Sequence, residues 1–154
     1  MKDYIERLKN EFVDTPDLII KEIKINSLHK IHIVFLETLC SQDKINEYIL
    51  KRLTSKKSIK DIESEVPGSN LKKIDNYDLC ENYLYNGFTL IFDKKNIYAI
   101  ETKGDLTRSI STNETEPALK GPKNAFVENY QTNIGMIKRR IRSHNLKTKN
   151  LKTN

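Results

Sequence analysis

Two strand-like segments separated by a short polar turn constrain the fold of this chain more than any other feature. Residues 18–25 end in strict alternation of apolar and charged side chains, which is typical of a half-buried strand. Asn26 and Ser27 favour a turn, and residues 31–36 then include an unbroken apolar run. Such a run indicates a strand that is covered on both faces of a sheet.

Helical patterns flank these two segments. Apolar side chains at positions 5, 8 and 12 predict an amphipathic helix that Pro16 ends. Ser41 is expected to cap a helix whose apolar stripe follows it. Asn76 is expected to cap another, which runs to residue 85 and stops at Gly87. The stripe behind Ser41 consists of Ile45, Tyr48, Ile49 and Leu53.

The remaining elements are shorter. Residues 88–92 and 97–100 are apolar and enclose a polar turn, so they predict a β-hairpin. Residues 54–75 are rich in Lys and Ser, with a short helix expected over 59–65, and a short strand is expected over 108–110. With 154 residues the chain is long enough for one core. We therefore predict an α/β fold: a small mixed β-sheet flanked by helices, ending in a long C-terminal helix and a flexible basic tail.

The C-terminal helix carries a narrow apolar seam. Its residues are spaced by three and four positions, and Pro122 is expected near the first turn. Basic side chains at 138–140 and 142 crowd the last turns, where they complement the negative end of the helix dipole. Ordinary core packing and contact with a second subdomain or a neighbouring subunit both remain open for the seam. The seam consists of Val127, Tyr130, Ile134, Ile137 and Ile141.

The positive charge of +6 is concentrated at the C-terminus. Residues 120–154 hold nine basic side chains and one acidic one, a charge of +8, and residues 1–119 hold 18 basic and 20 acidic groups, a charge of −2. This block is the one feature that could bind nucleic acid, but the nearby aromatics lie on or beside the apolar seam and do not form a stacking platform. A small basic nucleic-acid-binding protein is therefore the alternative function, and we consider it the less favoured one.

Nothing in the sequence calls for catalysis. His29, His32 and His144 have no ligands at metal-binding spacing, and there is no phosphate-binding loop or nucleophile signature. We predict no catalytic residues, no metal and no cofactor, and hence no enzyme. Cys40 and Cys80 are expected to be reduced, and no apolar run approaches the roughly 20 residues that a transmembrane helix needs.

Residues 108–141 strongly resemble the A subunit of the GerA-type spore germination receptors. That family carries an Arg, a spaced Glu, a Gly-Pro-Arg-Glu-Gly-Phe-x-Glu segment and then Thr-Asn-x-x-Leu-Ile-Arg-x-Arg-Ile. Lys123, Asn124 and Ala125 depart from it. The resemblance makes the following residues candidates for a family motif or interface: Arg108, Glu116, Gly121, Pro122, Phe126, Glu128, Asn133, Ile137 and Arg140.

The resemblance implies a non-catalytic signalling and assembly domain that acts in nutrient-triggered germination. It implies a permease-like B subunit, a lipoprotein C subunit and further A subunits as partners, in a complex at the spore inner membrane with this domain on the spore-core side. It divides the chain into an α/β subdomain (1–119), a linking helix (120–143) and a flexible tail (144–154). The family's second soluble subdomain and membrane helices would lie beyond this chain, which by itself is expected to be soluble.

Overall fold

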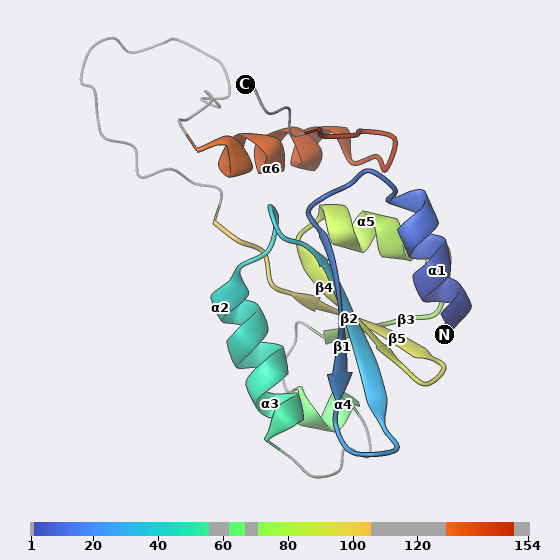
Figure 1. The fold of residues 1–154 in the computed structure, drawn as a ribbon. Coiled ribbons are helices and arrows are strands. Elements are labelled where there is room, and N and C mark those ends of the chain that lie inside the picture. Colours follow the sequence, from blue (N-terminus) through green and yellow to red (C-terminus); the bar gives the residue numbers. More distant parts are fainter. Residues whose placement is uncertain (1, 56–61, 67–70, 106–128, 150–154) are drawn as a thin grey trace, which may run out of the picture.

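The computed structural model describes residues 2–55, 62–66, 71–105 and 129–149. Within them a five-stranded sheet has the order β1-β2-β4-β5-β3 (Figure 1). Its strands are β1 (Leu18–Lys24), β2 (Lys30–Leu36), β3 (Leu71–Ile74), β4 (Phe88–Asp93) and β5 (Asn96–Glu101). The α/β class is confirmed, but every described strand pair is antiparallel, so the expected mixed sheet is wrong. The reason is that hairpins join β1 to β2 and β4 to β5, and each hairpin reverses the chain.

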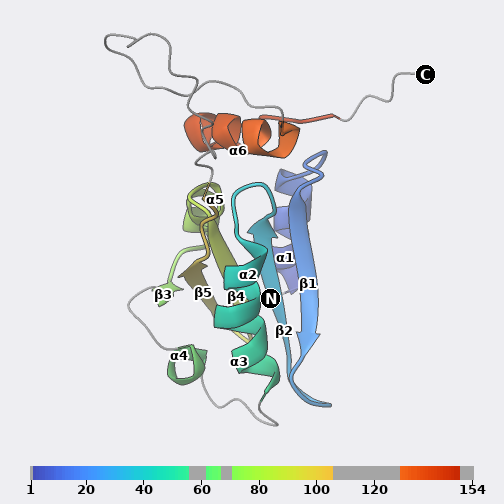
Figure 2. The same cartoon turned by 90° about the vertical axis from the view of Figure 1, so that its left-hand side faces the viewer.

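Helices cover both faces of the sheet (Figures 1 and 2). On one face, α1 (Lys2–Glu11) and α5 (Cys80–Tyr85) pack around buried residues such as Leu8, Leu84 and Val34. On the other, the continuous helical stretch α2 (Gln42–Ile45), η1 (Asn46–Leu50) and α3 (Lys51–Thr54) packs with α4 (Ile62–Glu65) over Ile33 and Phe35. Strand β2 therefore contributes alternate residues to two cores, which confirms that it is covered on both faces.

Local capping and turn signals are largely confirmed. The Lys44 amide donates to Ser41 Oγ at 3.4 Å, and the Asp78 amide donates to Asn76 Oδ1 at 2.9 Å, which caps the short helix η2 (Tyr77–Leu79) before α5. Gly87 has a φ of +80°, the left-handed conformation expected at the end of that helix. Stripe residues Ile45, Ile49 and Leu53 are fully buried, although the middle turn of their helix is a π-helix that the pattern did not predict.

The structure differs from the sequence-based prediction in two elements, strand β3 and helix α6. Strand β3 lies within residues 54–75, where the sequence predicts a short helix but no strand. The pattern does not reveal this strand because Lys72 and Lys73 are exposed and only its two end residues are apolar. Helix α6 (Tyr130–Ile141) begins at Tyr130, where Asn129 Oδ1 accepts the amides of Gln131 and Thr132, and not near Pro122. The predicted strand over 108–110 and residues 59–61 of the predicted short helix lie outside the described residues.

Both cysteine thiols lie in the core of the domain and are free. Burial raises the pKa of the Cys80 thiol from 9.0 to about 12, with a further increase from the charge of Glu11, and burial also raises the pKa of Cys40. A thiol whose pKa is higher in the folded than in the unfolded chain makes its full contribution to the free energy of unfolding when the pH is below the unfolded-state pKa. That contribution is lost as the pH rises from about 9 toward about 12.

Neither thiol is therefore expected to react with a disulfide reagent in the native protein at pH 8. We expect both to react after unfolding in denaturant, at least ~100-fold faster than in the folded state, because the native thiols are neutral and covered. A colorimetric thiol titration with and without denaturant measures this. A native thiol that reacted at the rate of the unfolded chain would contradict the burial of these side chains.

Candidate interaction surface on helix α6

Helix α6 lies across one end of the domain, above α5 and the end of the sheet (Figures 1 and 2). Its inward face is polar. The Lys138 side chain is fully buried and its ammonium pairs with the carboxylate of Asp17, just before β1. The other carboxylate oxygen of Asp17 accepts a hydrogen bond of 2.6 Å from the Thr38 hydroxyl. Gly135, one turn before Lys138, is also buried, so these two positions define the side of α6 that faces the domain.

Arg139 provides a second polar attachment. Its guanidinium donates to the carbonyl of Gly104, after β5, at 2.7 Å, and burial lowers the pKa of the side chain. Three buried polar atoms in the described structure make no hydrogen bond: Arg139 Nε, Thr15 Oγ1 and the Tyr85 hydroxyl. Arg139 thus joins α6 to the segment after β5 by a polar contact, with one of its own nitrogen atoms left unpaired.

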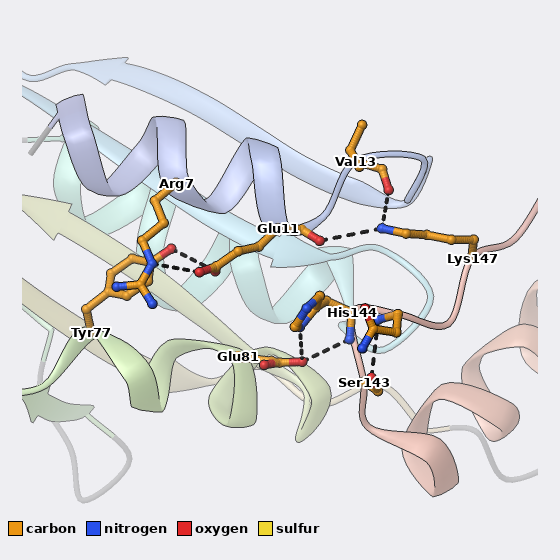
Figure 3. A network of polar contacts seen from close by, with 9 residues as sticks. Arg7, Glu11, Val13, Tyr77, Glu81, Ser143, His144 and Lys147 are labelled. Carbon is orange, nitrogen blue, oxygen red and sulfur yellow. Dashed lines mark hydrogen bonds and ion pairs between the residues drawn. The ribbon is translucent and has the colours of Figure 1, made fainter.

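The segment after α6 is attached by polar contacts as well (Figure 3). The His144 amide and its Nδ1 both lie 2.9 Å from Glu81 Oε1 on α5. The Lys147 ammonium donates to the carbonyls of Glu11, at 3.5 Å, and Val13. A cation at these carbonyls complements the negative end of α1. The structure describes residues 144–149 of the predicted tail and places these contacts in it, while residues 150–154 lie outside the described part of the chain. The flexibility of the tail stays a prediction.

The apolar side of α6, its outward face, is only partly covered by the domain. Tyr130 is 60% exposed and Ile141 is 53% exposed, while Ile134 and Ile137 are half-buried. These are the four described residues of the predicted seam, and two of them, Ile134 and Ile141, lie one turn before and one turn after the buried Lys138. A helix on a domain surface normally buries its apolar stripe, whereas α6 buries Lys138 and covers its apolar seam only in part. The ends of the described seam are exposed and its middle is half-buried, so core packing and contact with another surface both stay predictions for it.

Only three of the predicted site residues are described. Asn133, Ile137 and Arg140 lie on α6, where Asn133 and Ile137 are half-buried and Arg140 is exposed. The other six lie outside the described residues, so their roles stay predictions: Arg108, Glu116, Gly121, Pro122, Phe126 and Glu128. Sequence analysis did not predict Lys138, Asp17 or Arg139 as contact residues. Asp17 and Lys138 are 121 positions apart, and neither has a local pattern that would relate them.

Other titratable clusters are small. His29 Nε2 lies 2.6 Å from Asp93 Oδ1, and His32 Nε2 lies 3.7 Å from Glu22, so two histidines pair with single carboxylates. Over the described ranges, no group of three His, Cys, Asp or Glu side chains is arranged to hold a metal ion. The helices of the same ranges include none of the length and hydropathy that a membrane span requires.

The fold and this surface define a small α/β domain with a partly exposed apolar seam on its C-terminal helix. The chain belongs to the Bacillus/Clostridium GerA spore germination protein family, whose sequence profile matches residues 6–154. This membership confirms the resemblance described above and supports a role in spore germination.

Two curated relatives match nearly the whole chain. Spore germination protein KA of Bacillus subtilis (strain 168) is 30% identical over 159 residues, which cover 96% of this chain and 29% of the relative. Spore germination protein GerQA of Bacillus cereus is 29% identical over 157 residues, which cover 99% of this chain and 30% of the relative. The chain therefore spans about three-tenths of the length of these relatives.

The fold has a crystallographic counterpart. The N-terminal domain of the A subunit of the Bacillus megaterium spore germinant receptor GerK3 aligns with a TM-score of 0.63 at 19% identity. The alignment covers 96% of this chain and 56% of that one. At this identity the likeness establishes the shared fold.

Proposed function

We propose that this chain is a non-catalytic signalling and assembly domain of a germinant receptor A subunit. Its partners would be a permease-like B subunit, a lipoprotein C subunit and further A subunits, in a complex at the spore inner membrane with the domain on the spore-core side. The observation that carries the proposal is the apolar outward face of α6, with Tyr130 60% exposed and Ile141 53% exposed. These side chains and the half-buried Ile134 and Ile137 lie on one side of the helix, and contiguous exposed apolar surface is typical of interaction sites.

The basic C-terminal block supports this proposal better than nucleic-acid binding. Lys138 is neutralised by Asp17, Arg139 is bonded to a backbone carbonyl and Lys147 is bonded to two of them. Side chains engaged in this way are not available to neutralise phosphates, and phosphate contacts supply most of the affinity for random duplex. A steep fall in duplex affinity with rising salt would favour the alternative instead.

A single charge in the outward face tests the proposed function in spores. We expect Ile137→Arg to reduce the rate of nutrient-triggered germination by about tenfold or more, because loss of ~1.4 kcal/mol of contact energy corresponds to a factor of ten. The rate is followed as the loss of optical density, with the amount of the subunit measured in the membrane fraction by immunoblot.

Leu28→Arg is the matched control for this experiment. It makes the same chemical change at a side chain that is 96% exposed in the β1–β2 turn, away from α6. Spores with this substitution are expected to germinate normally. Normal germination of the Ile137→Arg spores, at an unchanged amount of subunit, would exclude the outward face of α6 as an interface.

A further inference from the structure

Polar contacts attach helix α6 and the segment after it to widely separated parts of the domain. We call residues 130–147, which make these contacts, the C-terminal clasp. Their partners lie before β1, after β5, on α5 and at the end of α1 (Figure 3 shows the last two). The contacts join Lys138 to Asp17, Arg139 to the Gly104 carbonyl, His144 to Glu81, and Lys147 to the Glu11 and Val13 carbonyls.

The apolar core of the domain is formed without the clasp. Among the described residues, the buried members of both core clusters and the half-buried apolar side chains packed against them all lie within positions 5–100. The clasp buries Gly135 and Lys138, neither of which brings an apolar side chain to the core. Ile134 and Ile137 are half-buried but pack against neither of these clusters in the described structure. Since apolar burial is the main favourable term in folding, the domain keeps most of it when the clasp is detached.

A left-handed turn at Arg142 joins α6 to the rest of the clasp. Arg142 has a φ of 36° and a ψ of 49°, and its amide donates to the Lys138 carbonyl at 2.9 Å. A non-glycine residue in this conformation is uncommon and persists where surrounding contacts hold it. After the turn, the His144 ring lies beside Phe12, with ring centroids 6.4 Å apart, and His144 contacts Glu81. The contacts before and after Arg142 therefore hold one geometry.

We propose that the C-terminal clasp is a conformational device that opens and closes as one unit while the sheet and its two core clusters stay folded. Hydrogen bonds weaken steeply with distance and angle, so each contact depends on the position that the others give the clasp. Opening returns the Lys138 ammonium and the Asp17 carboxylate to water, which offsets part of the lost attraction. The inference does not rest on the proposed function, since it concerns the chain by itself.

Amide hydrogen exchange of the whole chain, resolved by residue with NMR spectroscopy, tests whether the clasp is one unit. Amides of residues 134–141 report on the helix. The Leu146 amide, which donates to the Ser143 carbonyl at 3.0 Å, reports on the segment after it. Glu81→Ala removes a contact that is made only after α6. We expect it to accelerate exchange of the helix amides and of the Leu146 amide by the same factor, about tenfold.

Lys147→Met repeats the test from the clasp side. It changes no residue of the sheet or of the helices that cover it, so it does not act by unfolding them. We expect about fivefold faster exchange of the helix amides, although Lys147 contacts the end of α1 and lies outside α6. Glu47→Ala is the matched control for Glu81→Ala. Glu47 is exposed on η1, on the other face of the sheet, so its loss should leave exchange in the clasp unchanged.

Two results would overturn the proposal. If Glu81→Ala accelerates the Leu146 amide but leaves the helix amides unchanged, the attachments are independent of one another. If the helix amides of the unmodified chain exchange at the rate and with the denaturant dependence of β2 and β4, the clasp opens only when the whole domain unfolds. Both failures are distinguishable from failure of the proposed function, which is measured as the effect of Ile137→Arg on germination of spores.

Discussion

Replacement of Asp17 by alanine is expected to release helix α6 from the domain. The substitution leaves the Lys138 ammonium, whose side chain is fully buried, without its carboxylate partner. Removal of one member of a buried ion pair costs about 3–5 kcal/mol, because the remaining charge is neither solvated nor paired. The helix can avoid that cost by detaching, which returns Lys138 to water. Amide hydrogen exchange over residues 130–141 should therefore accelerate by roughly 100-fold or more, while β2 and β4 stay protected.

The double variant Asp17→Leu with Lys138→Met is the control for this prediction. Replacement of both charges by apolar side chains of similar size is often neutral or stabilising, so protection of α6 should largely return. Unchanged exchange of α6 in the Asp17→Ala chain would show that the ion pair does not hold the helix. Equal loss of protection in α6 and in the central strands would show instead that α6 is part of the cooperative core.

Replacement of Phe35 by alanine is expected to destabilise the whole domain. Phe35 is fully buried on β2, where it packs between the sheet and the α2–α3 helical stretch. Truncation of a buried Phe costs about 3–5 kcal/mol through lost apolar contact and the cavity that remains. Chemical denaturation followed by circular dichroism should show a lower midpoint with an unchanged slope.

Tyr130→Ala, at an exposed aromatic residue, is the variant to compare with Phe35→Ala. Because Tyr130 is 60% exposed on α6, its truncation should change the free energy of unfolding by no more than about 0.5 kcal/mol. A cost similar to that of Phe35→Ala would mean that the outward face of α6 belongs to the folding core. The pair of variants thus separates the residues that stabilise the domain from those proposed to contact a partner.

Together these expectations describe a helix with two unlike faces. The inward face is attached by ionic and hydrogen-bonded contacts at Lys138 and Arg139, and the outward face offers apolar side chains. Polar attachments depend on geometry and are lost together when the helix shifts, whereas apolar contacts tolerate sliding.

Short-range patterns predicted much of the fold. The alternation in β1, the apolar run in β2 and the caps at Ser41 and Asn76 are properties of neighbouring residues, and the structure confirms each of them. Strand β3 could not be predicted because four residues with two exposed lysines carry too little periodicity. Its place at the sheet edge depends on pairing with β5, more than 20 positions away.

The family and the set of side chains that share one face of α6 could be determined from the sequence alone. Helical periodicity decides that Tyr130, Ile134, Ile137 and Ile141 lie together, since that depends only on 3.6 residues per turn. Which face turns inward was decided by the tertiary structure. Asp17 lies where the buried ammonium of Lys138 can reach it, and a paired, buried charge fixes the rotation of the helix against the domain. No pattern of neighbouring residues contains that contact, because its two members are 121 positions apart and meet only after the sheet has formed.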